Sequence, residues 1–389
     1  MTNFPPFGEQ HELFRQSVRT FTEREIRPHA EKWDAERFFP DELFRRAGEL
    51  GYFGLRYDPS YGGSGLDYWY VGILIEELMK GRNVGAVVGL LIQCELATNV
   101  IHEYGSEELK QEWLVPAIKG EKIAALGVTE PGTGSDVGAI VTIARRDGDE
   151  YVVNGSKTFI TNGVRADFVT LAVRTGGPGT KGVSLVIAPT KLKGFSIGRR
   201  LEPIMATSSD MAELFFDDYR IPAGNLVGEE NRGFHYIMDL FQGERLVLGY
   251  ILNGWAKEML DEAMAYAEQR EAFGMKIAQM QVWRHRFADL LTEFRASKLL
   301  TYYATDRLTA RDPASQVYVS MAKLFASEFI IRASIHCMQV FGGYGLMADS
   351  YIGKISTGIT GAGVGAGTSE IMREIIAKQA FFTGTKFTE

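Results

Sequence analysis

A glycine-rich loop and a helical carboxylate are the residues of this chain whose types and spacing could do chemistry. In the loop, Gly132 and Gly134 leave backbone N–H groups unhindered, and Ser135 adds a hydroxyl. Such groups suit a concavity that binds phosphate. Further along, Glu244 and Arg245 are followed directly by apolar residues. A carboxylate in a water-poor site is a good general base, whereas the alternative for Glu244 is an exposed charge on a solvated helix face.

A second glycine-rich run, residues 361–366, fits the dinucleotide-binding fingerprint in its Ala-ended form. That fingerprint needs a strand–helix–strand unit with an acidic residue about 20 positions on, at the end of the next strand. The sequence up to Glu389 leaves no room for this strand. We therefore reject the fingerprint and interpret the run as a tightly turning loop whose backbone another group can approach closely.

Motifs for metal binding and for nucleophilic catalysis are missing from the sequence. The six histidines are scattered, and we find no Walker loop, His-Glu-x-x-His helix, Cys-x-x-Cys pair or Gly-x-Ser-x-Gly elbow. We therefore expect no metal site. Cys94 and Cys337 lie far apart, which argues against a disulfide scaffold and suits a reducing compartment.

Three zones of different periodicity must position these groups. Apolar residues recur every three to four positions from about residue 8 to 122, and the period changes to two from about 124 to 228. No helical pattern alternates with the strands expected there, which favours an antiparallel sheet or barrel. From residue 233 the helical pattern returns, and Asp312–Pro313 is a helix start signal. The expected strands include 151–153, 168–173 and 183–187, and the expected long helices are 234–271, 279–310 and 313–340.

These zones predict an α+β chain of three domains. We expect an N-terminal helical domain at residues 1–123 and a middle antiparallel β-barrel domain at 124–232. A C-terminal domain resembling a four-helix bundle follows at 233–389.

The charge balance narrows the possible partners. The 42 basic and 49 acidic residues give a net charge of -7. A protein that binds duplex nucleic acid or an anionic membrane is normally basic, so we expect neither partner. Residues 1–15 lack the pattern of a signal peptide, and the longest apolar stretch, residues 84–92, is too short to span a bilayer. We therefore expect a cytoplasmic protein.

Six segments, in their order and spacing, resemble the acyl-CoA dehydrogenase family along essentially the whole chain. Members of this family are flavoproteins that desaturate acyl thioesters between Cα and Cβ in the catabolism of fatty acids or amino acids. Their helical, β-barrel and helical fold matches the three zones. The segments are Leu126–Asp136, Asn154–Asn162, Glu213–Asp218 with Ile221–Pro222, Arg270–Gly274 with Gln281, Gln339–Gly345, and Gly367–Glu370.

The resemblance implies FAD as the cofactor and assigns residues to it. Phe159, often Trp in the family, and Thr161 would pack against the isoalloxazine ring. In the family the glycine-rich segment at Gly342 and Gly343 reaches the FAD of a neighbouring subunit, which implies a homotetramer. A lone Arg at a helix end is more often a solvated charge, and only its pattern with Phe273 and Gln281 favours binding. The full set is Leu126, Val128, Thr129, Gly134, Ser135, Phe159, Thr161, Arg270, Phe273, Gln281, Gln339, Gly342, Gly343, Thr368 and Glu370.

The catalytic base of most family members is missing at its usual place. They carry a Glu immediately before the Gly-Thr-Ser segment, where this chain has Ala366. The segment around Glu244 resembles the one in which isovaleryl-CoA and long-chain acyl-CoA dehydrogenases carry the base on another helix. The resemblance then implies that Glu244 removes the α-proton, that the Ala366 N–H binds the thioester oxygen, and that hydride passes from Cβ to flavin N5. The implied substrate contacts are Ser135, Gln242, Arg245, Ala366 and Gly367.

Three functions follow from this resemblance. The first is dehydrogenation of a short or branched acyl-CoA, with electrons passed to electron-transferring flavoprotein. The second is dehydrogenation of an acyl or aminoacyl group on a carrier protein, and the third is non-catalytic flavin binding. Thr357–Gly358 replaces the Arg-Asp usual in the family, and the sequence offers no physical reason for this change. Acyl-CoA oxidases and nitroalkane oxidases fit less well, because they carry an extra domain or an Asp at position 366.

Overall fold

The computed structural model describes residues 4–347 and 349–382, which fold into two compact units. The first unit comprises Met1–Pro28, Tyr68–Arg82 and Arg245–Glu389, and the second comprises His29–Asp67 and Asn83–Glu244. Helix α9 (Gly233–Gln269) contributes residues to both. The predicted order of helices, strands and helices is confirmed. The three domain boundaries expected from the sequence stay a prediction.

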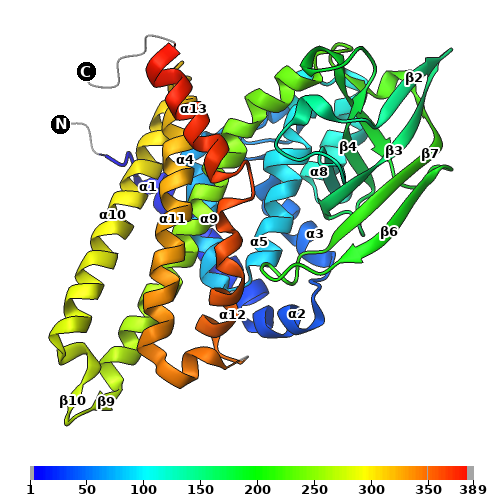
Figure 1. Ribbon diagram of the computed structural model, residues 1–389. Coiled ribbons are helices and arrows are strands. Elements are labelled where there is room, and N and C mark those ends of the chain that lie inside the picture. Colours follow the sequence, from blue (N-terminus) through cyan, green and yellow to red (C-terminus); the bar gives the residue numbers. More distant parts are fainter. Residues whose placement is uncertain (1–3, 348, 383–389) are drawn as a thin grey trace. The chain divides into compact units, whose positions relative to one another are not determined.

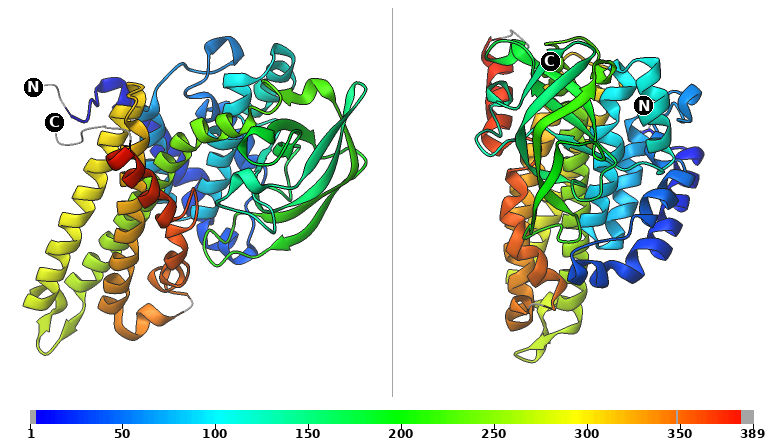
Figure 2. Two further views of the ribbon diagram at one scale, coloured as in Figure 1. Left: turned by 45° about the horizontal axis from the view of Figure 1, so that its top comes forward. Right: turned by 90° about the vertical axis from the view of Figure 1, so that its right-hand side faces the viewer.

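The first unit is a helical bundle. Helices α10 (Gln281–Thr309) and α11 (Ser315–Phe341) lie side by side in both views (Figures 1 and 2). Their packing is apolar, with the rings of Phe294 and Phe329 6.4 Å apart. The long helices α9, α10 and α11 confirm the three helical segments expected there. The other helices are α1 (Glu9–Phe21), α4 (Tyr68–Leu78), α12 (Tyr351–Gly358) and α13 (Ser369–Phe382).

The start of α11 differs slightly from the expected one. Asp312 Oδ1 accepts a hydrogen bond from the Ala314 N–H at 2.8 Å, and the Ser315 N–H donates to the Asp312 carbonyl at 2.9 Å. These bonds form a turn, so that α11 begins at Ser315 rather than at Pro313. The start signal is therefore correct in kind and two residues early in position.

The second unit contains an eight-stranded sheet in the order β6-β7-β3-β2-β4-β5-β8, with β1 paired to β4. Most neighbours are antiparallel, as expected, but β1 and β2 each pair with β4 in parallel, so the sheet is mixed. The hairpin of β2 and β3 separates β1 from β4 in sequence, which gives the crossover length that a parallel pair needs. The strands are β1 (Ala124–Gly127), β2 (Ile143–Asp147), β3 (Glu150–Thr161), β4 (Phe168–Arg174), β5 (Val183–Pro189), β6 (Phe195–Leu201), β7 (Met211–Pro222) and β8 (Leu226–Val227).

Helices of the second unit pack against this sheet in a shared apolar core. The stretch from Val84 to Tyr104 is helical over 21 residues, including a π-helical part, and has a mean hydropathy of 1.7. This is longer than the apolar stretch read from the sequence, and by length and composition it could cross a membrane, as could Ser315–Leu346. Protein buries 89% of the most apolar window of the first, which explains its composition without a bilayer. The helices are α2 (Ala30–Glu36), α3 (Glu42–Glu49), α5 (Val84–Leu91), η6 (Ile92–Ala97), α6 (Asn99–Tyr104), α7 (Glu107–Leu109) and α8 (Val115–Ile118).

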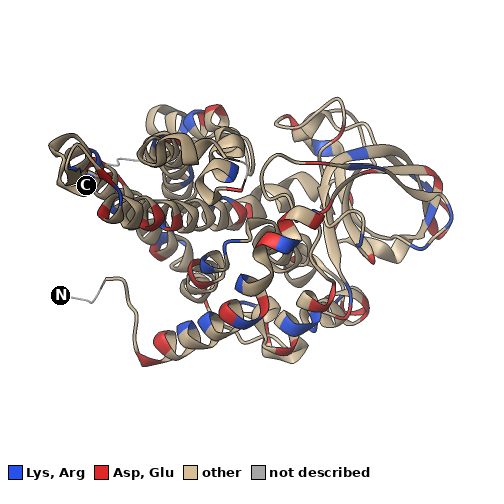
Figure 3. Cartoon of the chain, turned by 90° about the horizontal axis from the view of Figure 1, so that it is seen from below, with Lys and Arg blue, Asp and Glu red and all other residues tan. Residues whose placement is uncertain are grey.

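Charged residues of both signs are interspersed along the chain rather than separated by sign (Figure 3). Many of them form ion pairs. Lys257 pairs with Asp261 one turn further along α9, and Arg332 of α11 pairs with Glu293 of α10. Exposed pairs of this kind contribute little to stability.

Candidate active site

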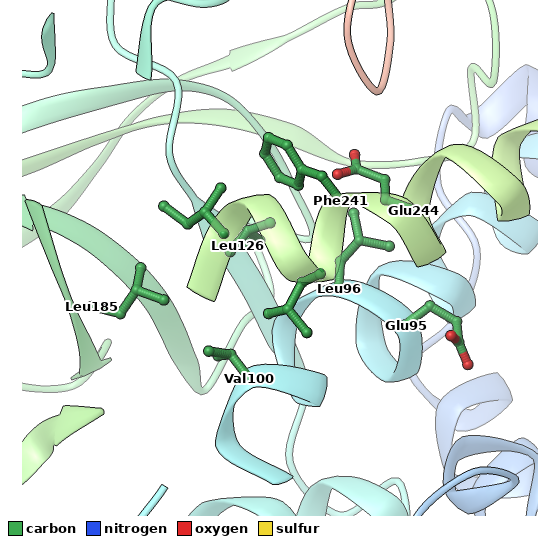
Figure 4. Close-up of a pocket in the computed structure, with 9 residues that line it drawn as sticks. Glu95, Leu96, Val100, Leu126, Leu185, Phe241 and Glu244 are labelled. Carbon is green, nitrogen blue, oxygen red and sulfur yellow. The ribbon is translucent and has the colours of Figure 1, made fainter. Parts of the chain in front are cut away.

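An apolar pocket in the second unit contains the candidate base. Four of its lining residues, Ile237, Leu240, Phe241 and Glu244, are spaced on α9 so that they share one helix face. The carboxylate of Glu244 and the ring of Phe241 project from the same side of the helix (Figure 4). The remaining lining comes from η6, α6 and the two strands β1 and β5: Glu95, Leu96, Val100, Leu126 and Leu185.

Two carboxylates line this pocket, and their surroundings differ. Glu95 accepts two hydrogen bonds on Oε2 from Arg56, at 3.2 and 2.9 Å, and this ion pair is largely buried. Its carboxylate points away from that of Glu244 (Figure 4). Glu244 is half-buried, and its Oε2 atom is shielded from solvent beside the apolar lining.

The predicted flavin segment begins in β1 and is fastened to β3. After Gly127 the chain continues through Val128 and Thr129, whose carbonyls accept hydrogen bonds from Lys157 Nζ at 3.1 Å and from the Thr158 N–H at 3.0 Å. Lys157 also forms a buried ion pair with Glu130 at 2.8 Å. These bonds fix residues 128–130 against β3. They therefore define the path of the chain towards the exposed loop at Gly134 and Ser135.

We predict that Lys157 makes stability depend on pH. Burial lowers its pKa from 10.5 to about 8, although Glu130 raises it. The unfolded chain then binds more protons than the native one between these values, so the contribution of this group to stability rises with pH across that window. We therefore compare the free energy of unfolding of the wild type with that of Lys157→Met. The difference, wild type minus variant, should increase by up to about 3 kcal/mol from pH 7 to pH 10.5.

Urea unfolding of both holoproteins, followed by tryptophan fluorescence, measures this difference. Lys191→Met is the control, because Lys191 is 86% exposed and pairs with Asp167 at the surface. Parallel pH profiles for the wild type and Lys157→Met would contradict the prediction.

A bulge in β3 turns Phe159 outward. The register between β3 and β7 shifts between Lys157 and Ile160, and Phe159 has a left-handed backbone (φ 59°) with a side chain 63% exposed. An aromatic residue in this conformation is strained, and such strain is typical of functional sites. The ring of Phe159 is therefore exposed at the bulge, and Thr161 lies half-buried two residues on.

In the first unit, Arg270 and Phe273 lie on a hairpin between α9 and α10. Strands β9 (Glu271–Ala272) and β10 (Met275–Lys276) pair around Phe273 and Gly274, which are both left-handed. Phe273 is 96% exposed at the tip. The ring of Tyr266, near the end of α9, stacks on Phe341 at 4.3 Å.

This stacking brings the hairpin close to the end of α11, where Gln339, Gly342 and Gly343 are exposed. Gln281 is the first residue of α10. Six residues expected to bind FAD therefore share one end of the bundle: Arg270, Phe273, Gln281, Gln339, Gly342 and Gly343.

The remaining predicted residues of this unit lie elsewhere. Lys323 of α11 contacts the carbonyls of Gly363 and Gly367, so the turn at Ala366 lies beside that part of the helix. About 24 Å of helix separates Lys323 from Gln339. Thr368 and Glu370 follow this turn at the start of α13. The predicted residues of the first unit thus form two groups rather than one.

The turn at Ala366 lies against α9. A Cβ atom added to Gly365 would lie 3.9 Å from Leu248 Cδ2, and one added to Gly367 would lie 3.8 Å from Arg245 Nε. Ala366 and Gly367 are both left-handed, with φ of 53° and 91°. The run that resembles a dinucleotide fingerprint, residues 361–366, contains no strand-to-helix junction. It comprises the end of a short 3-10 helix (residues 359–363) and the turn that follows it.

Several polar residues of this site escaped sequence analysis. Glu130 and Lys157 were recognised only as parts of segments, and Glu95 and Lys323 were not recognised at all. All four are less than 5% exposed. Lys and Glu are almost never buried unless they are paired, so their type alone suggests the surface. A sequence signal exists for Glu95 and Lys323, which stand among apolar neighbours, whereas Glu130 and Lys157 are flanked by polar or small residues.

The chain matches known proteins along its length. The acyl-CoA dehydrogenase N-terminal, middle and C-terminal domains match residues 8–121, 125–219 and 231–381. The short-chain-specific acyl-CoA dehydrogenase of Clostridium acetobutylicum is 36% identical over 96% of this chain and 98% of that protein. The mitochondrial long-chain-specific enzyme of Sus scrofa is 34% identical over 96% and 87%. A crystal structure of a probable acyl-CoA dehydrogenase from Mycobacterium abscessus has a TM-score of 0.93 and 39% identity, covering 96% of this chain and 99% of that one.

The order of helices, strands and helices, together with these matches, defines a flavoprotein oxidoreductase. The chain belongs to the acyl-CoA dehydrogenase family. Enzymes of this family are FAD-dependent, so the cofactor expected from the sequence is confirmed. The residues that bind it and those that act on the substrate remain proposals.

Proposed function

We propose that this enzyme introduces a Cα–Cβ double bond into a short or branched acyl-CoA, with Glu244 as the base. The observation that carries the proposal is the position of Glu244 at an apolar pocket, with one carboxylate oxygen shielded from solvent. An α-proton of a thioester is weakly acidic, and a carboxylate in a water-poor site is the stronger base that its removal needs.

The small residues at 365–367 support the relocation of the base. Glu244 lies one helical turn before Leu248, on the same face of α9, and Gly365 lies beside Leu248. The segment that carries the base in most relatives therefore borders α9 at Arg245 and Leu248, which follow Glu244 in the sequence. Ala366 has no carboxylate of its own, and in this proposal its N–H donates to the thioester oxygen as negative charge develops there.

The structure fits FAD at the segments proposed to hold it. Gly132, Gly134, Gly342 and Gly343 have open space where a side chain would be. The exposed ring of Phe159 is available for an isoalloxazine ring, as is the Arg270 hairpin for the adenosine and pyrophosphate. Bound FAD supplies the acceptor for the hydride that leaves Cβ. Leu126, Val128, Thr129, Ser135, Thr161, Phe273, Gln281, Gln339, Thr368 and Glu370 complete the proposed set.

The pocket supports a short, apolar acyl group. Its cavity is only about 10 Å³, so the lining side chains must move to admit any acyl group, which disfavours a long one. Apart from Glu244 and the Arg56-paired Glu95, its lining is aliphatic and aromatic. Similarity alone leaves the chain length open, because the relatives above include short-chain and long-chain enzymes. Ser135, Gln242, Arg245 and Gly367 are the other proposed substrate contacts.

Further proposals concern the assembly and its partners. The residues proposed for the adenosine and pyrophosphate of FAD lie at one end of the bundle, and Ala366 lies in another part of it. This separation supports a homotetramer in which neighbouring subunits share FAD sites. We also propose electron-transferring flavoprotein as the electron acceptor and the cytoplasm as the location. The second candidate substrate, an acyl group on an acidic carrier protein, is less favoured by the net charge of -7.

Anaerobic bleaching of the yellow holoenzyme tests the function. We expect butyryl-, isobutyryl- and isovaleryl-CoA to reduce the flavin at least about tenfold faster than octanoyl- or palmitoyl-CoA, because differential fit of a few methylenes has that magnitude. The same acyl groups on a carrier protein are the matched comparison. Faster bleaching by the carrier-bound forms would favour the second candidate. A yellow protein that no thioester bleaches would support a non-catalytic role.

A further inference from the structure

A buried lysine outside the predicted site holds the turn that contains Ala366. Lys323 of α11 is 0% exposed, and its ammonium group donates to the carbonyl of Gly363 at 3.2 Å and to that of Gly367 at 2.6 Å. These two carbonyls are at the two ends of a five-residue turn. One ammonium group thus binds both ends of the turn, and Ala366 lies between these two ends in sequence.

Lys323 binds the backbone of this turn directly. A buried ammonium group is costly unless it is well bonded. Its two hydrogen bonds to the turn are charge-assisted and therefore stronger than neutral ones. A methionine would fill the same space without that cost, so packing alone does not explain a lysine at this position.

The turn itself needs such an anchor. It contains Gly363, Gly365 and Gly367, which lose more conformational entropy on ordering than other residues. Ala366 is held at φ 53°, where a residue with a Cβ atom is strained. On the other side, Met372 is buried, and its Cε lies 2.9 Å from the position of an added Cβ on Gly367. The turn is therefore held between a charged donor and an apolar side chain.

We propose that Lys323 is a positioning residue that orients the Ala366 N–H towards the thioester oxygen. This inference rests on the proposed function, in which that N–H stabilises developing negative charge. An oxyanion donor works only when it is preorganised, and its loss costs about 10²–10³ in turnover. Because Lys323→Met would loosen the donor rather than remove it, we expect a smaller loss, about 10–10², with KM changed less than about threefold.

The test uses a readout that requires neither turnover nor a base. A 3-arylacryloyl-CoA is already unsaturated, and its absorption moves to longer wavelength when the thioester oxygen accepts strong hydrogen bonds. We expect this shift on the wild-type holoenzyme and the loss of most of it on Lys323→Met. Ser320→Ala is the matched control, because Ser320 is equally buried on α11 but bonds only to the Gln316 carbonyl of its own helix. Lys323→Gln, which keeps a neutral donor, should retain part of the shift.

Each outcome separates the two proposals. A full shift on Lys323→Met, with flavin bound, overturns the role of Lys323 and leaves the proposed function intact. A wild-type enzyme that binds this thioester and produces no shift overturns the assignment of Ala366, and the role of Lys323 with it. Loss of flavin from both Lys323→Met and Lys323→Gln shows that Lys323 serves the fold instead of positioning the donor. Glu244→Gln should keep the shift, because the base does not bond the oxygen.

Discussion

Glu244→Gln keeps FAD and loses about 10²–10⁴ in turnover, the usual contribution of a positioned general base. The amide has nearly the shape of the carboxylate but cannot accept the α-proton. Since Glu244 is not among the residues proposed to bind FAD, the flavin spectrum should stay that of the wild type. The rate of flavin reduction by a short acyl-CoA, measured anaerobically in a stopped-flow instrument, checks both expectations in one experiment.

Glu95→Gln is the matched control, because Glu95 is the other carboxylate of the same pocket. Arg56 already occupies its Oε2 atom, and it points away from Glu244 (Figure 4). We expect its reduction rate to stay within about tenfold of the wild type, with some loss of stability from the weakened ion pair. If Glu95→Gln loses the larger part of the activity and Glu244→Gln keeps it, the roles of the two carboxylates must be exchanged.

The elements that carry the site could be predicted because their signals are local. The period of the apolar residues identified α9, α10 and α11 within a few residues, and the β-branched runs identified β4 and β5. The parallel pairing of β1 with β4 could not be predicted, because it depends on contacts between residues distant in the sequence. The same holds for the assembly of each unit from separate segments.

The residues of the site also differ in how far the sequence could predict them. Phe159 and Ala366 could be named from their segments, but their left-handed backbones could not, since these follow from a β-bulge and from a turn held by another helix. Lys157 and Lys323 are charged residues whose burial depends on partners 27 and 40 positions away in sequence. A motif contains the residues proposed to contact the cofactor, whereas these lysines bind the backbone of the same segments from inside the protein. Sequence patterns therefore identify the contact residues of the site more readily than the buried residues that hold them in place.

If the base has moved from position 366 to position 244, it should be possible to move it back. In the Glu244→Gln background, Ala366→Glu restores a carboxylate beside the same helix face, because position 366 lies between Gly365 and Gly367, which border Leu248 and Arg245. The left-handed backbone already costs Ala366 about 1–2 kcal/mol, and it limits the rotamers open to a longer side chain, so the recovery should be partial. We expect flavin reduction about 10²-fold faster than in Glu244→Gln alone, within the range that a general base contributes.

Ala366→Gln in the same background is the control for this experiment, because it adds the same bulk without a proton acceptor. It should recover nothing. The pH profile provides a second check, since recovered activity that depends on a carboxylate must fall as that group is protonated. A double variant that binds FAD, retains the absorption shift of a bound 3-arylacryloyl-CoA and still stays at the rate of Glu244→Gln would show that a side chain at 366 cannot reach the α-proton. In that case the loss of the family's usual carboxylate and the presence of Glu244 would be unrelated.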